Sequence, residues 1–247
     1  MAGQKAGKQY AEKVISHIHE IIEKESAAID KAADKVAATI ARDGLVHLFG
    51  CGHSHMLAEE VFYRAGGLAA IQPILDTAVM LHEGAVKSSM VERMEGYAAH
   101  ILNNYDVKPG EPIIILSNSG VNGVPVDMAM EAKAKGLYVI AIVSSAYYED
   151  APRHSSSRKL YEVADLVIDN HLPHGDALME VAGTDIRMSP GSTVIGATIL
   201  NMMMTMAVCK LAEQGIEPPV FRSGNVPGGF EQNLKYIEKY RKRIKHL

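Results

Sequence analysis

The stretch LFGCGHSHMLAEE, residues 48–60, shows how this chain is organised. An apolar run that begins at Leu45 ends abruptly at Gly50-Cys51-Gly52, and a serine and a helical pattern follow. Two glycines allow a tight turn and a close approach of the backbone to a ligand. The stretch therefore predicts a buried strand that turns directly into a helix, with a ligand-binding loop between them.

Five short apolar runs of this kind alternate with helical patterns, after a long N-terminal helix predicted over residues 5–42. Each run is nearly continuous rather than alternating, which indicates strands covered on both faces. The alternation predicts parallel βαβ units, and so an α/β fold with a five-stranded parallel sheet between two layers of helices. The runs are Leu45–Phe49, Ala70–Leu75, Pro112–Leu116, Tyr138–Val143 and Leu166–Ile168, and the helical segments between them are 54–66, 90–104, 122–136 and 154–164.

The length of the chain suits one large domain with extra helical elements. It has 247 residues, of which 47% are hydrophobic, enough to bury a sizeable core. We divide it into an N-terminal helical segment, residues 1–43, a ligand-binding domain, residues 44–215, and a C-terminal loop and helix, residues 216–247.

Charge and cysteine content narrow the functional class. The net charge of -4 gives no basic footprint for nucleic acid. The two cysteines cannot form a disulfide framework, and the first 44 residues contain no compact apolar segment of a signal peptide, so we expect a cytoplasmic protein. The apolar stretch from Thr193 to Ala212 includes Asn201 and Lys210. We interpret it as a buried helix rather than a membrane span, which needs roughly 20 apolar residues.

Polar residues follow the first and third predicted strands, and in an open parallel sheet ligands bind at the carboxyl ends of the strands. In the first loop, a helix starting near Ser54 would point free N–H groups into the turn, which makes a good anion site. This loop lacks the third glycine of a dinucleotide fingerprint and the Gly-Lys-Ser/Thr of a Walker A loop. The second loop, Ser117-Asn118-Ser119-Gly120, offers hydroxyl and backbone N–H donors to one anion. Two such loops can converge on one phosphate and its sugar.

Three segments carry a resemblance to a known family, over about residues 40 to 215. GCGHSHMLA resembles the GxGxSxxxA motif of the sugar isomerase (SIS) domain, and SNSGVNGVPVDMAMEAKAKG resembles its SxSGxTxxxxxAxxxAKxxG motif. RHSSSRKLYEVADLVIDN is similar to the segment that leads into its fifth strand. The resemblance implies a three-layer α-β-α sandwich of the flavodoxin-like or Rossmann-like kind and a phosphosugar ligand.

The resemblance also implies which residues contact that ligand. The phosphate contacts fall on Ser54, Ser117, Ser119 and Asn122, where an asparagine replaces the usual threonine. Ser192 and Thr193 begin the long apolar helix and look like an N-cap, and by resemblance they approach the sugar hydroxyls. The predicted binding set is Gly52, His53, Ser54, Ser117, Asn118, Ser119, Gly120, Asn122, Ser192 and Thr193.

Isomerisation of an aldose to a ketose moves a proton between C1 and C2 through an enediol. It needs a base near C2 and a group that opens the ring or polarises the carbonyl. We expect Glu83, in the loop after the second strand, to be the base. We expect His171 or His174, after the fifth strand, to assist ring opening. A solvated carboxylate without a catalytic role is the alternative for Glu83.

A zinc site is a further alternative, since phosphoheptose isomerases can carry zinc at His and Glu ligands. No spacing in this chain is diagnostic of metal, so we predict neither a metal nor a cofactor. The candidate ligands would be His53, His55, Glu59, Glu60, His171 and His174.

These observations favour a phosphosugar isomerase. Two alternatives remain open: a lyase that resembles the N-acetylmuramic acid 6-phosphate etherases, and a phosphosugar-binding sensor without turnover. The segment before the first strand lacks the charge expected of a DNA-binding domain. The N-terminal helix and the apolar helix both need partners, so we expect a homodimer or homotetramer that binds neither nucleic acid nor a membrane.

Overall fold

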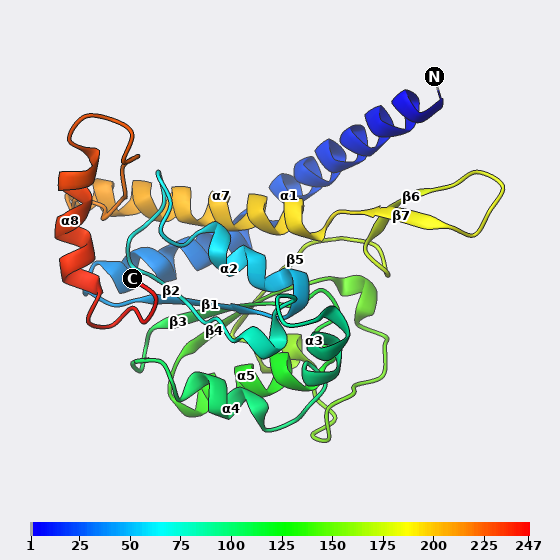
Figure 1. The fold of residues 1–247 in the computed structure, drawn as a ribbon, viewed down its shortest axis with the longest axis horizontal. Coiled ribbons are helices and arrows are strands. Elements are labelled where there is room, and N and C mark those ends of the chain that lie inside the picture. Colours follow the sequence, from blue (N-terminus) through cyan, green and yellow to red (C-terminus); the bar gives the residue numbers. More distant parts are fainter. Residues whose placement is uncertain (1) are drawn as a thin grey trace.

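The computed structural model describes residues 2–247. Its centre is a five-stranded parallel sheet in the order β2-β1-β3-β4-β5 (Figure 1). Each of the five predicted apolar runs forms one strand, which confirms the α/β class. The strands are β1 (Val46–Gly50), β2 (Ile71–Pro73), β3 (Pro112–Leu116), β4 (Tyr138–Val143) and β5 (Leu166–Asp169).

Helices cover both faces of the sheet, so the strands are apolar on both sides. On one face, Leu48 and Ile114 pack in a core cluster with the helices α1 (Ala2–Ile40), α2 (Met56–Glu60) and α7 (Ser192–Glu213). On the other face, Phe49 and Ile113 pack with α4 (Tyr97–Leu102) and α5 (Gly123–Ala134). Figure 1 shows these three layers.

Helix α7 is long and apolar enough to cross a membrane, judged by length and composition alone. In the fold it runs beside α1 (Figure 1). Ile195, Ile199 and Met203 are fully buried in the core cluster that also contains Ile29 of α1. The sequence prediction of a buried helix is therefore confirmed for this face of α7.

The helices that follow the strands are shorter than the patterns predict. Segment 54–66 is a 3₁₀ turn, η1 (Gly52–His55), followed by the five residues of α2. Segment 90–104 is divided between α3 (Ala85–Val91) and α4, because Gly96 takes a φ of 80° between them, a left-handed conformation in which a helix cannot continue. Of segment 154–164, only α6 (Leu160–Val163) is helical.

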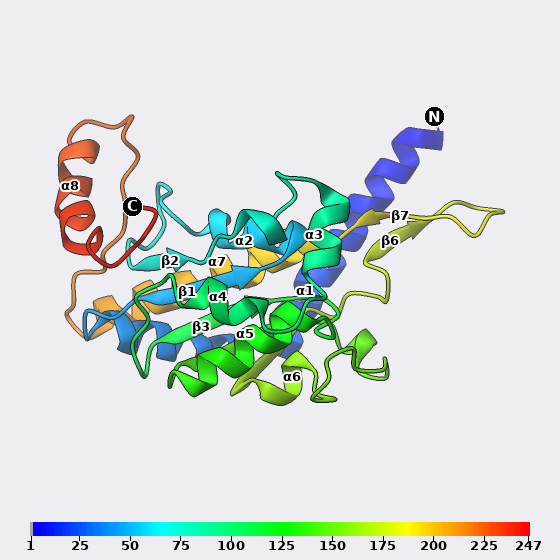
Figure 2. The same cartoon turned by 60° about the horizontal axis from the view of Figure 1, so that its bottom comes forward.

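The sequence analysis missed an antiparallel hairpin of β6 (Ala177–Glu180) and β7 (Arg187–Pro190). Figures 1 and 2 show that this hairpin and the N-terminal half of α1 project from the same side of the molecule. The Tyr10 hydroxyl of α1 donates to the Pro190 carbonyl (3.0 Å), and Lys13 donates to the Leu178 carbonyl (2.6 Å).

At the opposite end, α8 (Gly229–Tyr240) buries two tyrosines in the core cluster of α1 and α7. The remaining 3₁₀ turns are η2 (Thr77–Val79) and η3 (Ser145–Tyr147).

Candidate functional site

A hollow opens where the loops after β1 and β3 meet the first turn of α7. These two strands are neighbours at the centre of the sheet, and the helices that follow them, α2 and α5, lie on opposite faces. Ligands bind in open α/β sheets at such a switch point. The hollow measures about 300 Å³ when the space open to solvent is included, and it is lined by His53, Ser54, Leu57, Leu116, Ser117, Asn118, Ile142, Asn170, Ser192, Thr193 and Gly196.

Glycine is required at the turn after β1. A Cβ atom on Gly50 would lie 2.5 Å from the Ser54 carbonyl oxygen, far inside contact distance, and Gly52 has a φ of 55°, which favours glycine. The turn is closed by the Ser54 N–H, which donates to the Cys51 carbonyl at 2.9 Å. This tight fold of the backbone brings His53 and Ser54 to the rim of the hollow.

Hydrogen bonds fix the loop after β3 and join it to the two neighbouring loops. Ser117 is buried, and its hydroxyl accepts a hydrogen bond from the Gly120 N–H at 3.3 Å. Asn118 accepts a hydrogen bond from the side-chain amide of Asn170 at 2.5 Å, and the Asn118 carbonyl accepts from the Ser144 N–H at 2.9 Å. The loops after β3, β4 and β5 are thereby joined into one wall of the hollow.

The start of α7 forms the opposite wall. Asp176, which precedes β6, accepts hydrogen bonds from the backbone N–H groups of Gly191 (3.0 Å) and Ser192 (2.9 Å) and from the Ser192 hydroxyl. An acidic side chain from a distant segment therefore caps the start of this helix. Thr193 lines the hollow beside Ser192.

The chemistry of the hollow is that of neutral hydrogen-bond donors. It offers hydroxyl groups of serine and threonine, two side-chain amides and one imidazole. Among residues 2–247, no Lys or Arg lines it. Such a lining suits a small ligand with many hydroxyl or phosphate oxygens, because each hydroxyl or amide can donate to one of them.

Two predicted phosphate contacts lie outside this lining. Ser119 is half-buried in the same loop as Ser117. Asn122 stands before α5, where its amide donates to Glu92 (3.0 Å) and accepts from Arg153 (2.9 Å). The structure brings Ser54, Ser117, Asn118, Ser192, Thr193 and His53 together, and uses the Asn122 side chain to hold neighbouring segments.

Comparison with known proteins identifies the family of this chain. A family model described as the SIS domain matches residues 9–144. The chain belongs to the SIS domain family. This SIS domain is 49% identical to a UPF0309 protein of Geobacillus kaustophilus, over 96% of this chain and 94% of that protein. The relative's name states no activity.

Solved structures show the same fold at low sequence identity. The phosphoheptose isomerase GmhA of Neisseria gonorrhoeae is 15% identical, with a TM-score of 0.52, over 85% of this chain and 98% of that one. A phosphoheptose isomerase of Francisella tularensis is 14% identical, with a TM-score of 0.50, over 87% of this chain and 100% of that one. At this identity the likeness establishes the fold alone.

In this SIS domain, Glu83 lies on an exposed loop and does not line the hollow. A hydrogen bond from Lys87 holds the pKa of Glu83 below its ordinary value. The neighbouring residue, His82, places its ring 5.3 Å from the ring of His55 in η1. The loop that carries Glu83 therefore lies against the turn that forms the rim of the hollow.

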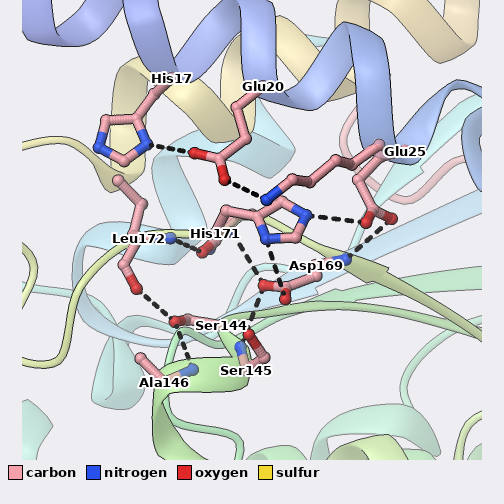
Figure 3. A network of polar contacts seen from close by, with 11 residues as sticks. His17, Glu20, Glu25, Ser144, Ser145, Ala146, Asp169, His171 and Leu172 are labelled. Atoms are coloured by element: carbon pink, nitrogen blue, oxygen red, sulfur yellow. Dashed lines mark hydrogen bonds and ion pairs between the residues drawn. The ribbon is translucent and has the colours of Figure 1, made fainter.

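His171 is fixed between two carboxylates rather than facing the hollow (Figure 3). Its Nε2 lies 2.9 Å from Glu25 of α1, and its Nδ1 lies 3.3 Å from Asp169 at the end of β5. Nearby on α1, a hydrogen bond from Lys24 lowers the pKa of Glu20. This network attaches the middle of α1 to the end of β5.

His174 is exposed and also lies outside the lining. Its ring packs on Tyr147 with centroids 4.3 Å apart, and its Nε2 lies 3.2 Å from Asp150. None of the three predicted catalytic residues lines the hollow. Sequence reasoning instead missed Asn170, although it follows the fifth strand just as Ser117 follows the third.

Proposed function

We propose that this SIS domain binds a phosphorylated sugar in the hollow and interconverts its aldose and ketose forms. The observation that carries the proposal is the convergence of Ser54, Ser117 and the start of α7 at the switch point of the sheet. Two solved structures of the same fold are named phosphoheptose isomerases, which supports a phosphosugar ligand.

We assign the hydroxyls of Ser54 and Ser117 to hydrogen bonds with the phosphate. Ser119, which lies in the same loop as Ser117, is assigned to the phosphate as well. Thr193 and the paired amides of Asn118 and Asn170 then face the sugar hydroxyls. Because all these donors are neutral, the phosphate is recognised through hydrogen bonds rather than ion pairs.

Glu83 is assigned as the base. A glutamate carboxyl is ionised at neutral pH, and the carboxylate is the form that accepts a proton. Reaching the sugar requires that it leave Lys87, and Gly84, with a φ of 131°, provides a backbone position that tolerates such a change. His53 contributes an imidazole to the lining and is assigned to ring opening, since His171 and His174 are engaged elsewhere.

A phosphosugar sensor without turnover is the second candidate. It is favoured by one observation, that Glu83, His171 and His174 all lie outside the lining of the hollow. The two functions differ in whether the bound sugar exchanges its C2 proton.

Proton exchange in D₂O separates these candidates. A panel of hexose, heptose and N-acetylmuramate phosphates is first screened for binding, and each bound sugar is then followed by NMR for loss of its C2 proton. An isomerase exchanges this proton and forms the isomer, and Glu83→Gln slows exchange at unchanged affinity. Binding without exchange would indicate the sensor, release of lactate the lyase, and no binding by any sugar phosphate would contradict both proposals.

A homo-oligomer is proposed as the functional form. The outer face of α7 forms a shallow, largely apolar depression lined by Val194, Ala197, Thr198, Asn201, Met202, Thr205 and Met206. Exposed apolar surface of this kind is typical of protein interfaces. Light scattering of the purified chain should give a dimer or tetramer, whereas a monomeric mass at micromolar concentration would contradict this.

A further inference from the structure

The segment that leads into α6 is bonded to the loop after β3. We call this segment, residues 153–160, the strap. The N–H of its first residue, Arg153, donates to the Val121 carbonyl at 3.3 Å. The N–H of its last residue, Leu160, donates to the Gly120 carbonyl at 2.8 Å. The strap is therefore attached at both ends to the loop that forms one wall of the hollow.

This attachment extends to a side chain of the hollow. The N–H of Gly120 donates to the Ser117 hydroxyl at 3.3 Å, and Ser117 lines the hollow. Gly120 has a φ of 62°, and a Cβ atom there would lie 3.3 Å from the Cβ of Leu160, so the strap packs directly on this turn. The position of the strap therefore influences where the Ser117 hydroxyl lies.

His154 fixes the strap to helix α5. It is buried, with 8% of its surface exposed, and its Nε2 lies 2.7 Å from a carboxylate oxygen of Asp127 in α5. The N–H and the hydroxyl of Ser156 donate to Nδ1, at 3.0 and 2.7 Å. Nδ1 therefore carries the lone pair, and Nε2 carries the proton that Asp127 accepts. A hydrogen bond between a buried donor and a carboxylate is among the stronger ones in proteins.

Two carboxylates join this point to the stretch between α3 and α4. The second oxygen of Asp127 accepts from the Gly96 N–H at 2.6 Å. Glu95 accepts from the N–H of Ser155 (2.8 Å) and from its hydroxyl, and these bonds hold the pKa of Glu95 below its ordinary value. One oxygen of Glu95 also lies 3.8 Å from Nε2 of His154. Three segments of the chain thus meet at His154.

We propose that His154 is a positioning residue for phosphate binding in the hollow. It does not line the hollow itself. Its bond to Asp127 fixes the strap, and the strap fixes Gly120 and Ser117 in the geometry that receives the phosphate. The binding role rests on the proposed function, whereas the effect of His154 on the loop does not depend on it.

Amide hydrogen exchange of the chain without ligand tests the effect on the loop. His154→Leu removes both ring nitrogens and keeps an apolar side chain. We expect the N–H groups of Gly120 and Leu160 to exchange at least about tenfold faster relative to the buried amides of β3, because the loop opens locally. A general loss of stability would not raise this ratio, since it also speeds exchange in the strand.

Two further variants separate the hydrogen bond from the packing of the ring. His154→Gln keeps a side-chain N–H that can donate to Asp127, so it should restore the exchange ratio to within about threefold of the native value. Asp127→Ala removes the same bond from the side of α5 and should raise the ratio as His154→Leu does. Because both changes remove one bond, the double variant should be little worse than either single variant.

Titration with inorganic phosphate, followed by NMR, tests the binding role. We expect an affinity at least about fivefold weaker in His154→Leu and close to native in His154→Gln. Arg243→Ala is the matched control, because it breaks an ion pair with Glu111 at the amino end of β3, away from the strap. It should lower stability and still bind phosphate as the native chain does.

The outcomes distinguish this proposal from the proposed function. A native exchange ratio or native phosphate affinity in His154→Leu would overturn the positioning role and leave the proposed function standing. Absence of phosphate binding in the native chain would contradict the proposed function, and the binding role of His154 with it. The exchange ratio would then still decide whether His154 fixes the loop.

Discussion

Replacement of Gly50 by alanine tests whether the turn after β1 positions Ser54 for binding. The added Cβ would lie 2.5 Å from the Ser54 carbonyl oxygen and 2.6 Å from its carbonyl carbon, whereas an ordinary contact is at least 3.4 Å. Because the clash is with backbone, Ser54 must move by about 0.9 Å. A hydrogen bond of about 2.7 Å lengthened by this amount is no longer a hydrogen bond.

The expected effects are on both stability and affinity. Overpacking of this kind costs about 1–3 kcal/mol, which lowers the melting temperature of a chain of this size by about 2–12 °C. Loss of one hydrogen bond to a charged phosphate costs about 1.5–3 kcal/mol, or a 10- to 150-fold weaker phosphosugar affinity. Scanning calorimetry and titration calorimetry measure the two effects.

Gly224→Ala is the matched control, because a Cβ at this position meets no atom within 4 Å. It should change the free energy of unfolding by less than about 0.5 kcal/mol and leave the affinity unchanged. The reasoning is refuted if Gly50→Ala melts and binds as the native chain does.

The remaining predictions concern groups that hold the fold around the site. Burial alone would raise the pKa of Glu111, but hydrogen bonds from His47 and Arg243 outweigh it and hold the pKa well below its ordinary value of 4.5. This group therefore stabilises the fold above pH 4.5 and loses its contribution as the pH falls below that value; urea unfolding between neutral and acid pH should show this loss. Arg243→Ala should lower the free energy of unfolding at neutral pH by about 3 kcal/mol and weaken the acid dependence, and an unchanged urea midpoint would count against the ion pair. His171→Asn, which tolerates the φ of 52°, should cost about 2 kcal/mol and change phosphosugar affinity by less than about twofold, because His171 lies outside the hollow; a tenfold loss of affinity would instead favour a direct role.

The sheet could be predicted from the sequence because its strands are covered on both faces. Continuous apolar runs such as PIIIL at 112–116 are typical of buried parallel strands when they alternate with helical segments. The hairpin of β6 and β7 was missed because Arg187–Pro190 is mostly exposed, so no apolar periodicity marks it. Helix ends were overestimated where tertiary contacts, rather than the helical pattern, decide where the chain turns.

The residues that come together at the hollow could be predicted from the sequence where they follow the strands. Contacts between distant segments could not be predicted. Ser54 and Ser117 follow buried strands, and the topology alone brings them together. The pairing of His171 with Glu25 requires knowing that α1 crosses the end of β5, which the sequence does not show. The proximity of His82 to His55 is likewise a product of the folded loops.

The most direct measurement of the central claim is titration calorimetry with one sugar in its phosphorylated and unphosphorylated forms, chosen from the sugars that bind in the screen. We predict that the phosphorylated form binds at least about tenfold more tightly, and that Ser54→Ala and Ser117→Ala each lose about tenfold in affinity for it. Ser16→Ala, an exposed serine on α1, should bind as the native chain does. Equal affinity for the two forms, or native affinity in both hollow variants, would contradict the assignment of the hollow as a phosphosugar site.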